Sequence, residues 1–263
     1  MISIFVMNNH SLFENNGNIL LKGFIKDSNF NEICEKLKKD VLIELKNIDK
    51  KKIGGYLMGN LAVHTNKYNR IIYDILIKGG LERIIEEITN NKFSDYEISM
   101  GGEISMGGNL NIPGGYAQHP HTDSSHNNKF IIVNVATENI HEKNGPLEII
   151  CGTHKVKLPY WKFLLKKYNT IKFLSLRGDV IIRKSELWHR GLKNSSNETG
   201  YLFSLELRLK KNPNNQNLFN VNENIKISSN FFRPTFFGRI EEVVYCKFRF
   251  FYNLLRLIKS FYK

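Results

Sequence analysis

The residues best suited to chemistry lie in the segment Gln118-His119-Pro120-His121-Thr122-Asp123, together with the distant His189. His121 and Asp123 are two positions apart, so on a β-strand their side chains project from the same face. The imidazole of His189, arriving from a strand far down the chain, would complete a set of two histidines and one carboxylate. Such a set binds iron(II) on one face and leaves the other coordination positions open. Because His-x-Asp is common by chance, it predicts a metal site only together with its surroundings.

The elements that must position this site begin with helices. Residues 19–25 form a short apolar run that predicts a strand. An apolar stripe at helical spacing over residues 30–45 predicts a helix. A second helical pattern covers residues 68–89 and is broken at Gly79-Gly80. We therefore expect residues 1–93 to be mainly helical.

From residue 94 the pattern changes to short strands separated by turns. Ile98-Ser99-Met100-Gly101-Gly102 is copied six residues later, and glycine pairs inside strand-like sequence indicate bends or bulges. Pro113-Gly114-Gly115 is a turn that leads into the metal segment. The expected strands cover residues 130–136, 147–151, 171–176, 179–183 and 201–209, and one expected helix lies near 160–168.

These expectations define one domain over residues 1–263. Its fold is mainly β with flanking helices, and its core over residues 94–210 is a barrel or jelly roll. Residues 211–238 are polar and without periodicity, which predicts a loop. Residues 239–263 predict a C-terminal helix.

Two further segments carry a family resemblance. The run Asn144-Gly145-Pro146-Leu147-Glu148-Ile149-Ile150-Cys151-Gly152-Thr153-His154 is similar to the N-G-P-L-x-x-x-P-G-S-H segment of the phytanoyl-CoA dioxygenase-like family of iron(II)/2-oxoglutarate oxygenases. The stretches 178–182 and 187–191 resemble that family's later strand, distal histidine and following loop. The resemblance covers about residues 111–208, and more faintly 19–45.

The resemblance implies a double-stranded β-helix (a cupin-like jelly roll) with iron(II) bound by His121, Asp123 and His189. It implies 2-oxoglutarate as cosubstrate, O₂ as oxidant, and hydroxylation of an aliphatic carbon in a small molecule or biosynthetic intermediate. A carboxylate occupies the middle ligand position, which argues against a halogenase. His154 matches a structural position of the family, while His119 and His126 are expected to lie outside the ligand set, and Trp188 to pack in the barrel.

The sequence departs from the family pattern where 2-oxoglutarate would bind. The family normally has an arginine about eleven residues after the distal histidine, and Gly200 stands at that place. Ser204 and Arg208 lie further along the same strand with the same parity, although Arg208 would be about 26 Å from Gly200. With Asn134, they are the candidate cosubstrate residues. The candidate replacement cations are Lys129, Arg183, Arg190 and Lys193. The departure bears on 2-oxoglutarate rather than on the metal.

Composition limits the alternatives. The net charge of +13 suggests the hypothesis that the protein binds nucleic acid or an anionic membrane. The lysines are scattered in a chain rich in Lys, Asn and Ile, as an AT-rich genome would produce, so nucleic acid is disfavoured. Three distant cysteines argue against a disulfide framework, and no apolar run is long enough for a transmembrane helix. We expect a cytoplasmic protein.

Two alternatives remain open. The C-terminal helix combines aromatic and basic residues, as an interfacial helix on the inner membrane face would. Packing of this helix on the barrel or on a second subunit is the preferred interpretation. The second alternative is a catalytically silent β-helix that lost 2-oxoglutarate binding with the arginine at Gly200 and acts as a binding module. Substrate identity and oligomeric state cannot be read from the sequence.

Overall fold

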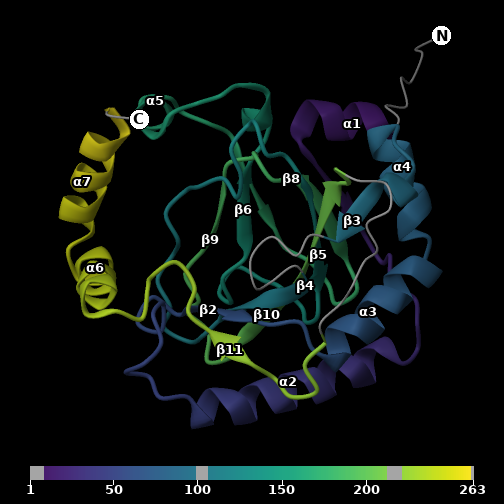
Figure 1. Cartoon of the computed structure of the whole chain (residues 1–263), viewed down its shortest axis with the longest axis horizontal. Helices are drawn as coiled ribbons and strands as arrows, with labels where there is room; N and C mark the ends of the chain where they lie inside the picture. The colour runs from purple at the N-terminus through teal and green to yellow at the C-terminus, as the bar shows by residue number, and fades with distance from the viewer. Residues whose placement is uncertain (1–8, 99–105, 212–220, 262–263) are drawn as a thin grey trace.

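The computed structural model of the chain describes residues 9–98, 106–211 and 221–261 (Figure 1). The repeated glycine segment predicted at 98–108 lies largely outside these ranges. In the described part, two antiparallel sheets face each other. The larger sheet has the order β1-β8-β5-β10-β4-β2-β11, with β3 also paired to β10, and the smaller has the order β7-β6-β9. An apolar cluster that includes Ile149 of β6, Phe173 of β7 and Ile181 of β8 joins the two sheets.

The strands of the larger sheet are β1 (Asn18–Leu21), β2 (Asn60–Val63), β3 (Tyr96–Ile98), β4 (Met106–Asn111), β5 (Ile131–Ala136), β8 (Val180–Lys184), β10 (Gly200–Leu209) and β11 (Ile227–Ser228). Those of the smaller sheet are β6 (Leu147–Ile150), β7 (Thr170–Phe173) and β9 (His189–Gly191). Two short 3-10 turns cover Phe93–Asp95 (η1) and Thr153–Lys155 (η2). This arrangement confirms the predicted fold class, mainly β with a jelly-roll core and flanking helices.

Four helices pack on the outer side of the larger sheet: α1 (Asn9–Asn16), α2 (Phe30–Asn47), α3 (Lys67–Lys78) and α4 (Leu81–Thr89). Strand β10 shows how the alternation of its residues creates two faces. Phe203 and Leu205 are fully buried in the core shared with these helices. Ser204 and Glu206, between and after them, face the cavity on the inner side. The predicted break at Gly79-Gly80 separates α3 from α4.

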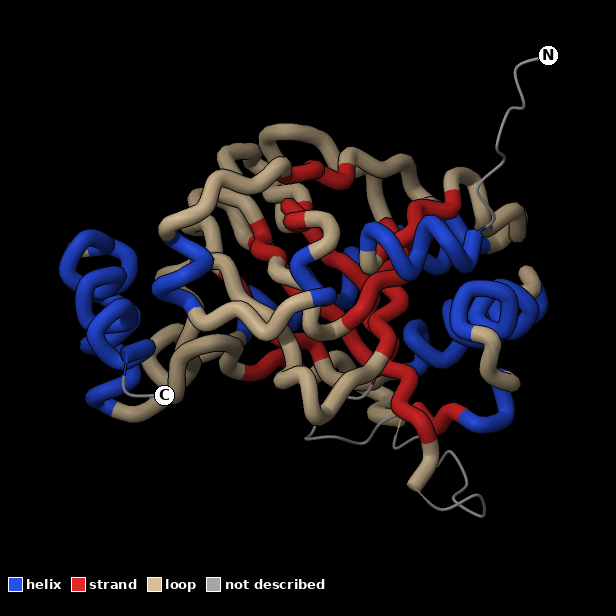
Figure 2. The backbone as a smooth tube through the Cα atoms, turned by 90° about the horizontal axis from the view of Figure 1, so that it is seen from above, coloured by secondary structure: helices blue, strands red, loops and turns tan. Residues whose placement is uncertain are grey.

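Three further helices lie at the opposite end of the molecule, as both views show (Figures 1 and 2). They are α5 (Tyr160–Leu164), α6 (Phe236–Lys247) and α7 (Arg249–Phe261). The single C-terminal helix expected at 239–263 is therefore two helices. They are separated at Phe248, whose φ of −127° and ψ of 48° are not helical.

Two expectations about the flanking segments need correction. Part of the polar loop predicted at 211–238 is β11, which pairs with β2 through Ile227↔Val63. The N-terminal part is helical but also contributes β1 and β2 to the larger sheet. Strand β1 overlaps the strand predicted at 19–25. Strands β2 and β11 are short and pair with each other from more than 100 positions apart, so no local pattern indicates them.

Candidate metal centre

The backbone brings two histidines together. The amide of His121 donates to the carbonyl of His189 at 3.0 Å, and the reverse bond is also 3.0 Å long. This antiparallel bridge places the imidazole centroids 4.4 Å apart. Asp123 lies in a bend rather than a strand, and its backbone amide donates a hydrogen bond to the carbonyl of Ser185 at 2.9 Å. The shared face of His121 and Asp123 thus arises from a bridge and a bend, and not from the regular strand that the spacing suggested.

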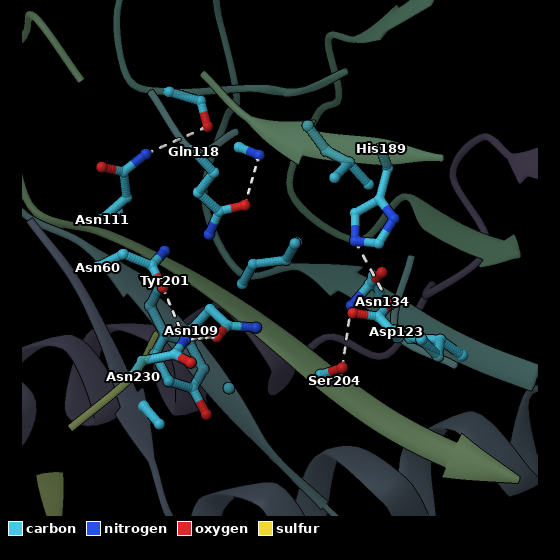
Figure 3. Close-up of a pocket in the computed structure, with 18 of the residues that line it drawn as sticks. Asn60, Asn109, Asn111, Gln118, Asp123, Asn134, His189, Tyr201, Ser204 and Asn230 are labelled. Carbon is cyan, nitrogen blue, oxygen red and sulfur yellow. Dashed lines mark hydrogen bonds and ion pairs between the residues drawn. The ribbon is translucent and has the colours of Figure 1, made fainter. Parts of the chain in front are cut away.

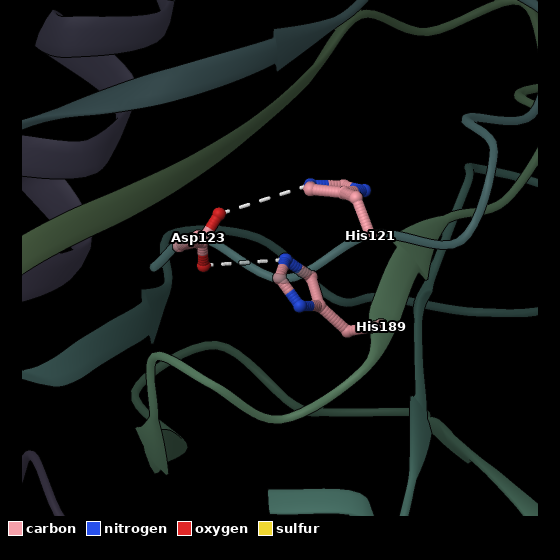
Figure 4. A group of neighbouring side chains, drawn as sticks. All are labelled: His121, Asp123 and His189. Atoms are coloured by element: carbon pink, nitrogen blue, oxygen red, sulfur yellow. Dashed lines mark ion pairs between the residues drawn. The ribbon is translucent and has the colours of Figure 1, made fainter. Parts of the chain in front are cut away.

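These three side chains form one group with the chemistry of a metal site (Figure 4). Their potential ligand atoms all lie within 4.8 Å of one another. Nε2 of His121 is 3.7 Å from Oδ1 of Asp123, and Nε2 of His189 is 3.3 Å from Oδ2 of Asp123. The three residues predicted as ligands are therefore neighbours, although 66 positions separate Asp123 from His189 in the sequence.

Second hydrogen bonds orient both imidazoles. Nδ1 of His121 is 2.9 Å from the carbonyl oxygen of His119, and Nδ1 of His189 is 2.9 Å from that of Leu187. A carbonyl only accepts, so each Nδ1 carries the proton and each Nε2 presents a lone pair toward Asp123. Fixing the tautomer in this way is what metal-binding histidines require.

Electrostatics favour the same protonation state. Burial lowers the pKa of His189 to about 3, and the charge of Arg183 adds to this effect. Burial also lowers the pKa of His121. For Asp123, burial opposes ionisation, but the charge and the hydrogen bond of Arg183 favour it, and the pKa of the carboxyl is lowered. Two neutral imidazoles and one carboxylate are the donor set that a divalent first-row metal such as iron(II) accepts.

Arg183 holds the carboxylate of Asp123 in place. Its guanidinium is buried, and Nη1 donates to Oδ2 of Asp123 at 2.7 Å. Nε donates to Oδ1 of Asn134 at 3.2 Å, and the Asn134 amide donates to Oγ of Ser204 at 3.1 Å. A chain of hydrogen bonds thus runs from Asp123 through Arg183 and Asn134 to Ser204. Asn134 and Ser204, predicted as cosubstrate residues, lie directly opposite each other on β5 and β10.

The other predicted cations lie elsewhere. Arg208 contacts the ring of Phe130 at 3.7 Å, and the residues lining the described cavity do not include it. Nζ of Lys129 is 3.5 Å from Glu186, and Arg190 pairs with Glu148. Arg190 and Lys193 line a separate hollow beside α7. Among the described residues that line the cavity, Arg183 is the one lysine or arginine.

The group next to Gly200 is an acidic side chain, where the family has a basic one. A Cβ atom at Gly200 would lie 3.1 Å from Oε1 of Glu138, which also accepts a hydrogen bond from the amide of Tyr201 at 3.0 Å. Burial raises the pKa of Glu138, although Lys38 partly offsets that effect. This corner of the cavity therefore holds a carboxyl group and not a cation.

The metal group opens into a cavity of about 450 Å³ whose far side is lined by amides (Figure 3). This "amide end" consists of Asn60, Asn109, Asn111, Gln118 and Asn230. The opposite "metal end" consists of His121, Asp123, His189, Arg183, Asn134 and Ser204.

Most side-chain oxygens of the amide end accept hydrogen bonds within the described part of the protein, whereas most of its side-chain nitrogens do not donate there. Nδ2 of Asn230 donates to the side-chain oxygens of Asn60 and Asn109, at 2.7 and 3.0 Å. Within the described residues, the amide nitrogens of Asn60, Asn109 and Gln118 have no hydrogen-bond partner and face the cavity.

Sequence analysis missed this amide end. Asn109 and Asn111 alternate with the buried Leu110, a period-2 signal for two polar side chains on one face of a strand. The richness of the chain in asparagine was instead attributed to its genome. The contributions of Asn60 and Asn230 depend on the pairing of β2 with β4 and on a loop far along the chain.

His119 and His154 lie outside the metal group and have structural contacts of their own. His119 is held among the rings of Tyr245, Tyr252 and Phe231, and burial lowers its pKa to about 2. His154 contacts the carbonyl of Glu14 at 3.0 Å. Trp188 stacks on Phe163 with a centroid distance of 4.2 Å, as expected of a packing residue.

Solved structures share this fold at low sequence identity. The non-heme alpha ketoglutarate dependent epimerase SnoN from nogalamycin biosynthesis is 13% identical, with a TM-score of 0.53 over 74% of this chain and 80% of that chain. EctD from S. alaskensis with 2-oxoglutarate and 5-hydroxyectoine is 16% identical, with a TM-score of 0.56 over 74% and 73%. The carbocyclase SnoK from the same biosynthesis as SnoN is 8% identical, with a TM-score of 0.52 over 74% and 81%. At these identities the likeness shows the fold alone.

Comparison with curated proteins gives no match. The family model of phytanoyl-CoA dioxygenase (PhyH) matches residues 13–199, which include the whole metal group and most of both sheets. The resemblance stated from the motifs is confirmed: the chain belongs to the phytanoyl-CoA dioxygenase family.

Proposed function

We propose that this protein is a mononuclear non-haem iron(II) and 2-oxoglutarate-dependent oxygenase that hydroxylates an aliphatic carbon of a small, polar molecule. The observation that carries the proposal is the group of His121, Asp123 and His189, with tautomers fixed for metal binding, at one end of a cavity large enough for a small substrate. Family membership supports the same chemistry.

The residues present fit the metal. Three protein ligands leave positions free for a chelating cosubstrate and O₂. When bound, iron(II) and 2-oxoglutarate supply an oxidant that can attack an unactivated C–H bond. The protein's own contribution is to hold the ligands, exclude bulk water and place one substrate carbon near the metal.

Arg183 and Ser204 are the residues that would hold the far carboxylate of 2-oxoglutarate. Arg183 uses Nε and Nη1 on Asn134 and Asp123, so Nη2 remains as a donor. Oγ of Ser204 accepts from Asn134, which leaves its own proton available to an anion. A cation on β8 and a hydroxyl on β10, on either side of β5, provide charge-assisted binding to a carboxylate.

The amide end would recognise the substrate. Amide nitrogens without internal partners donate to hydroxyl or carbonyl oxygens, and they make a poor surface for a hydrocarbon chain. The carboxyl groups of Glu138 and Glu206 also line this cavity, which disfavours an anionic substrate.

The test is calorimetric titration under anaerobic conditions, first with Fe(II) and then with 2-oxoglutarate. We expect one metal per chain, cosubstrate binding only after metal loading, and slow succinate formation on admission of O₂. A protein that binds no divalent metal would refute the proposal.

One observation supports a second candidate function, that of a catalytically silent binding module. Glu138 occupies the corner where the family's arginine would project, and Arg183 is already paired with Asp123. Metal binding without any heat of 2-oxoglutarate binding would favour this candidate, and the amide end would then be the functional part of the cavity.

A further inference from the structure

Helix α7 contacts the rest of the protein through its polar side. Nη2 of Arg249 lies 3.4 Å from the carbonyl of Gln118, and Nη1 of Arg256 lies 3.1 Å from that of Pro120. Asn253, between them on the same helical face, lines the hollow beneath. On the preceding helix, the hydroxyl of Tyr245 donates to the carbonyl of Ala117. The polar stripe of the C-terminal helices thus points inward, against the segment that leads to His121.

The apolar side of these helices points to solvent. Phe236, Phe237 and Phe250 are 74%, 80% and 75% exposed. The other large apolar side chains exposed on or between α6 and α7 are Ile240, Val243, Phe248, Phe251, Leu254, Leu255 and Ile258. A helix that serves only to cover a barrel has the reverse orientation. An exposed apolar surface of this extent indicates an interaction site.

The apolar surface continues onto α5, which packs against α7. The guanidinium of Arg256 lies 3.8 Å above the ring of Tyr160. Leu164 and Leu165, at the end of α5, are 47% and 78% exposed. Residues 155–167 and helices α6 and α7 therefore form one surface, which we call the C-terminal face.

The C-terminal face is strongly basic. Residues 155–167 contain five lysines and no aspartate or glutamate. Helices α6 and α7 contain five lysines and arginines beside Glu241 and the buried Glu242, and Arg249 and Arg256 among them bond inward. Much of the net charge of +13 is thus concentrated here, next to the exposed phenylalanines. Lys157, Lys162, Lys166, Lys167 and Lys247 are all exposed.

We propose that the C-terminal face binds the surface of an anionic lipid bilayer. Aromatic and aliphatic side chains enter the boundary between head groups and acyl chains, while lysines contact lipid phosphates. In the part of the chain that the structure describes, no helix is long and apolar enough to cross a bilayer, so the contact is peripheral. A second copy of this chain is a poor occupant, because two faces of such positive charge repel each other.

The experiment is co-sedimentation of the full-length protein with vesicles of phosphatidylcholine alone or with about one-third phosphatidylserine. We expect binding to the anionic vesicles to exceed binding to neutral ones at least about tenfold and to weaken with added salt. Phe250→Ser/Phe251→Ser removes apolar insertion, and Lys166→Glu/Lys167→Glu reverses two charges. Each double variant is expected to reduce anionic vesicle binding at least about tenfold.

Matched controls lie on the opposite side of the molecule. Ile43→Ser removes an apolar side chain that is 50% exposed on α2, and Lys22→Glu/Lys26→Glu reverses two exposed charges near β1. Both should bind vesicles as the unmodified protein does, and all variants should retain their melting temperatures because the changed side chains are exposed. Absence of binding to anionic vesicles would overturn the proposal, as would equal binding to both vesicles. A dimer in sedimentation velocity that Phe250→Ser/Phe251→Ser dissociates, without vesicle binding, would identify a second copy as the occupant and also overturn it.

Discussion

The two ends of the cavity differ in how much of their hydrogen bonding is completed within the protein. At the metal end, the side chains of Arg183 and Asn134 and both imidazoles have hydrogen-bond partners within the protein. At the amide end, Asn60, Asn109 and Gln118 leave their amide nitrogens toward the cavity. The first end is preorganised for one kind of ligand, a divalent cation, whereas the second can adapt to a polar molecule. Changes at the two ends should therefore have different consequences.

The largest effect is expected from the ligands themselves. His189→Ala should weaken binding of Fe(II) or Mn(II) at least about 100-fold, because two protein ligands hold the ion poorly. Anaerobic calorimetry measures this directly. His126→Ala, on the same loop as Asp123 but outside the metal group, is the control and should change the affinity less than about twofold. Equal losses for the two variants would place the metal elsewhere.

The second-largest effect is expected from loss of Arg183, which should reduce the stability of the folded protein. Arg183→Met would leave the Asp123 carboxylate without its cation and Asn134 without a donor, at a cost of about 3 kcal/mol in the free energy of unfolding. Metal binding supplies a new positive charge beside Asp123, so the loss should be smaller in the Mn(II)-loaded protein. Urea unfolding with and without Mn(II) distinguishes the two states. An identical loss in both would mean that Arg183 acts independently of the metal group.

A matched pair of asparagine substitutions compares the two ends directly. Asn134→Leu should cost about 2 kcal/mol, because Arg183 and the carbonyl of Phe203 lose a buried partner. Asn109→Leu should lower the free energy of unfolding by less than about 0.5 kcal/mol, since it removes one hydrogen bond from Asn230 in the lining of an open cavity. Thermal and urea unfolding of both variants provide the comparison. Similar losses would contradict the division of the cavity.

A smaller, pH-dependent effect is expected at Glu206. Burial, aided by the charge of Asp123, raises its pKa from 4.5 to about 7, although Arg208 opposes the shift. The folded protein binds this proton more tightly than the unfolded chain, so stability falls as pH rises from about 4.5 to 7. Glu206→Gln should therefore gain about 1–2 kcal/mol at pH 8 and little at pH 4. A gain that is the same at both pH values would show that ionisation of Glu206 is not its cause.

The metal group was predictable because its signal is chemical and local. His121 and Asp123 stand two positions apart, and the segments around His189 resemble the family's later strand, distal histidine and following loop. Helix α2 was predictable from its own periodicity, and Phe30, Cys34, Leu37 and Val41 are indeed its buried residues. In each case the residues that carry the information are close in sequence.

The amide end and Arg183 were not predictable in this way. Asn60, Asn109 and Asn230 meet because β2 pairs with β4 and the loop after β11 returns over both. Arg183 was one of several candidate cations, and only the register of β8 against β5 turns it toward Asn134 and Asp123. Register between distant strands is set by the packing of the whole sheet. The C-terminal helix was expected to pack on the barrel, and it does so with its polar side.

The hydrogen bonds that Tyr245, Arg249 and Arg256 of the C-terminal helices donate to the metal-bearing segment all go to backbone carbonyls. Tyr245, Arg249 and Arg256 reach the carbonyls of Ala117, Gln118 and Pro120, and a carbonyl is present whatever the side chain. Substitutions at Ala117, Gln118 and Pro120 can therefore accumulate without loss of these hydrogen bonds, whereas His119 also packs its ring against Tyr245 and Tyr252. The three donors have no such freedom. During divergence of related chains, the approach to the metal should drift in sequence while these helical positions stay fixed, so substrate preference can change without loss of the support behind it.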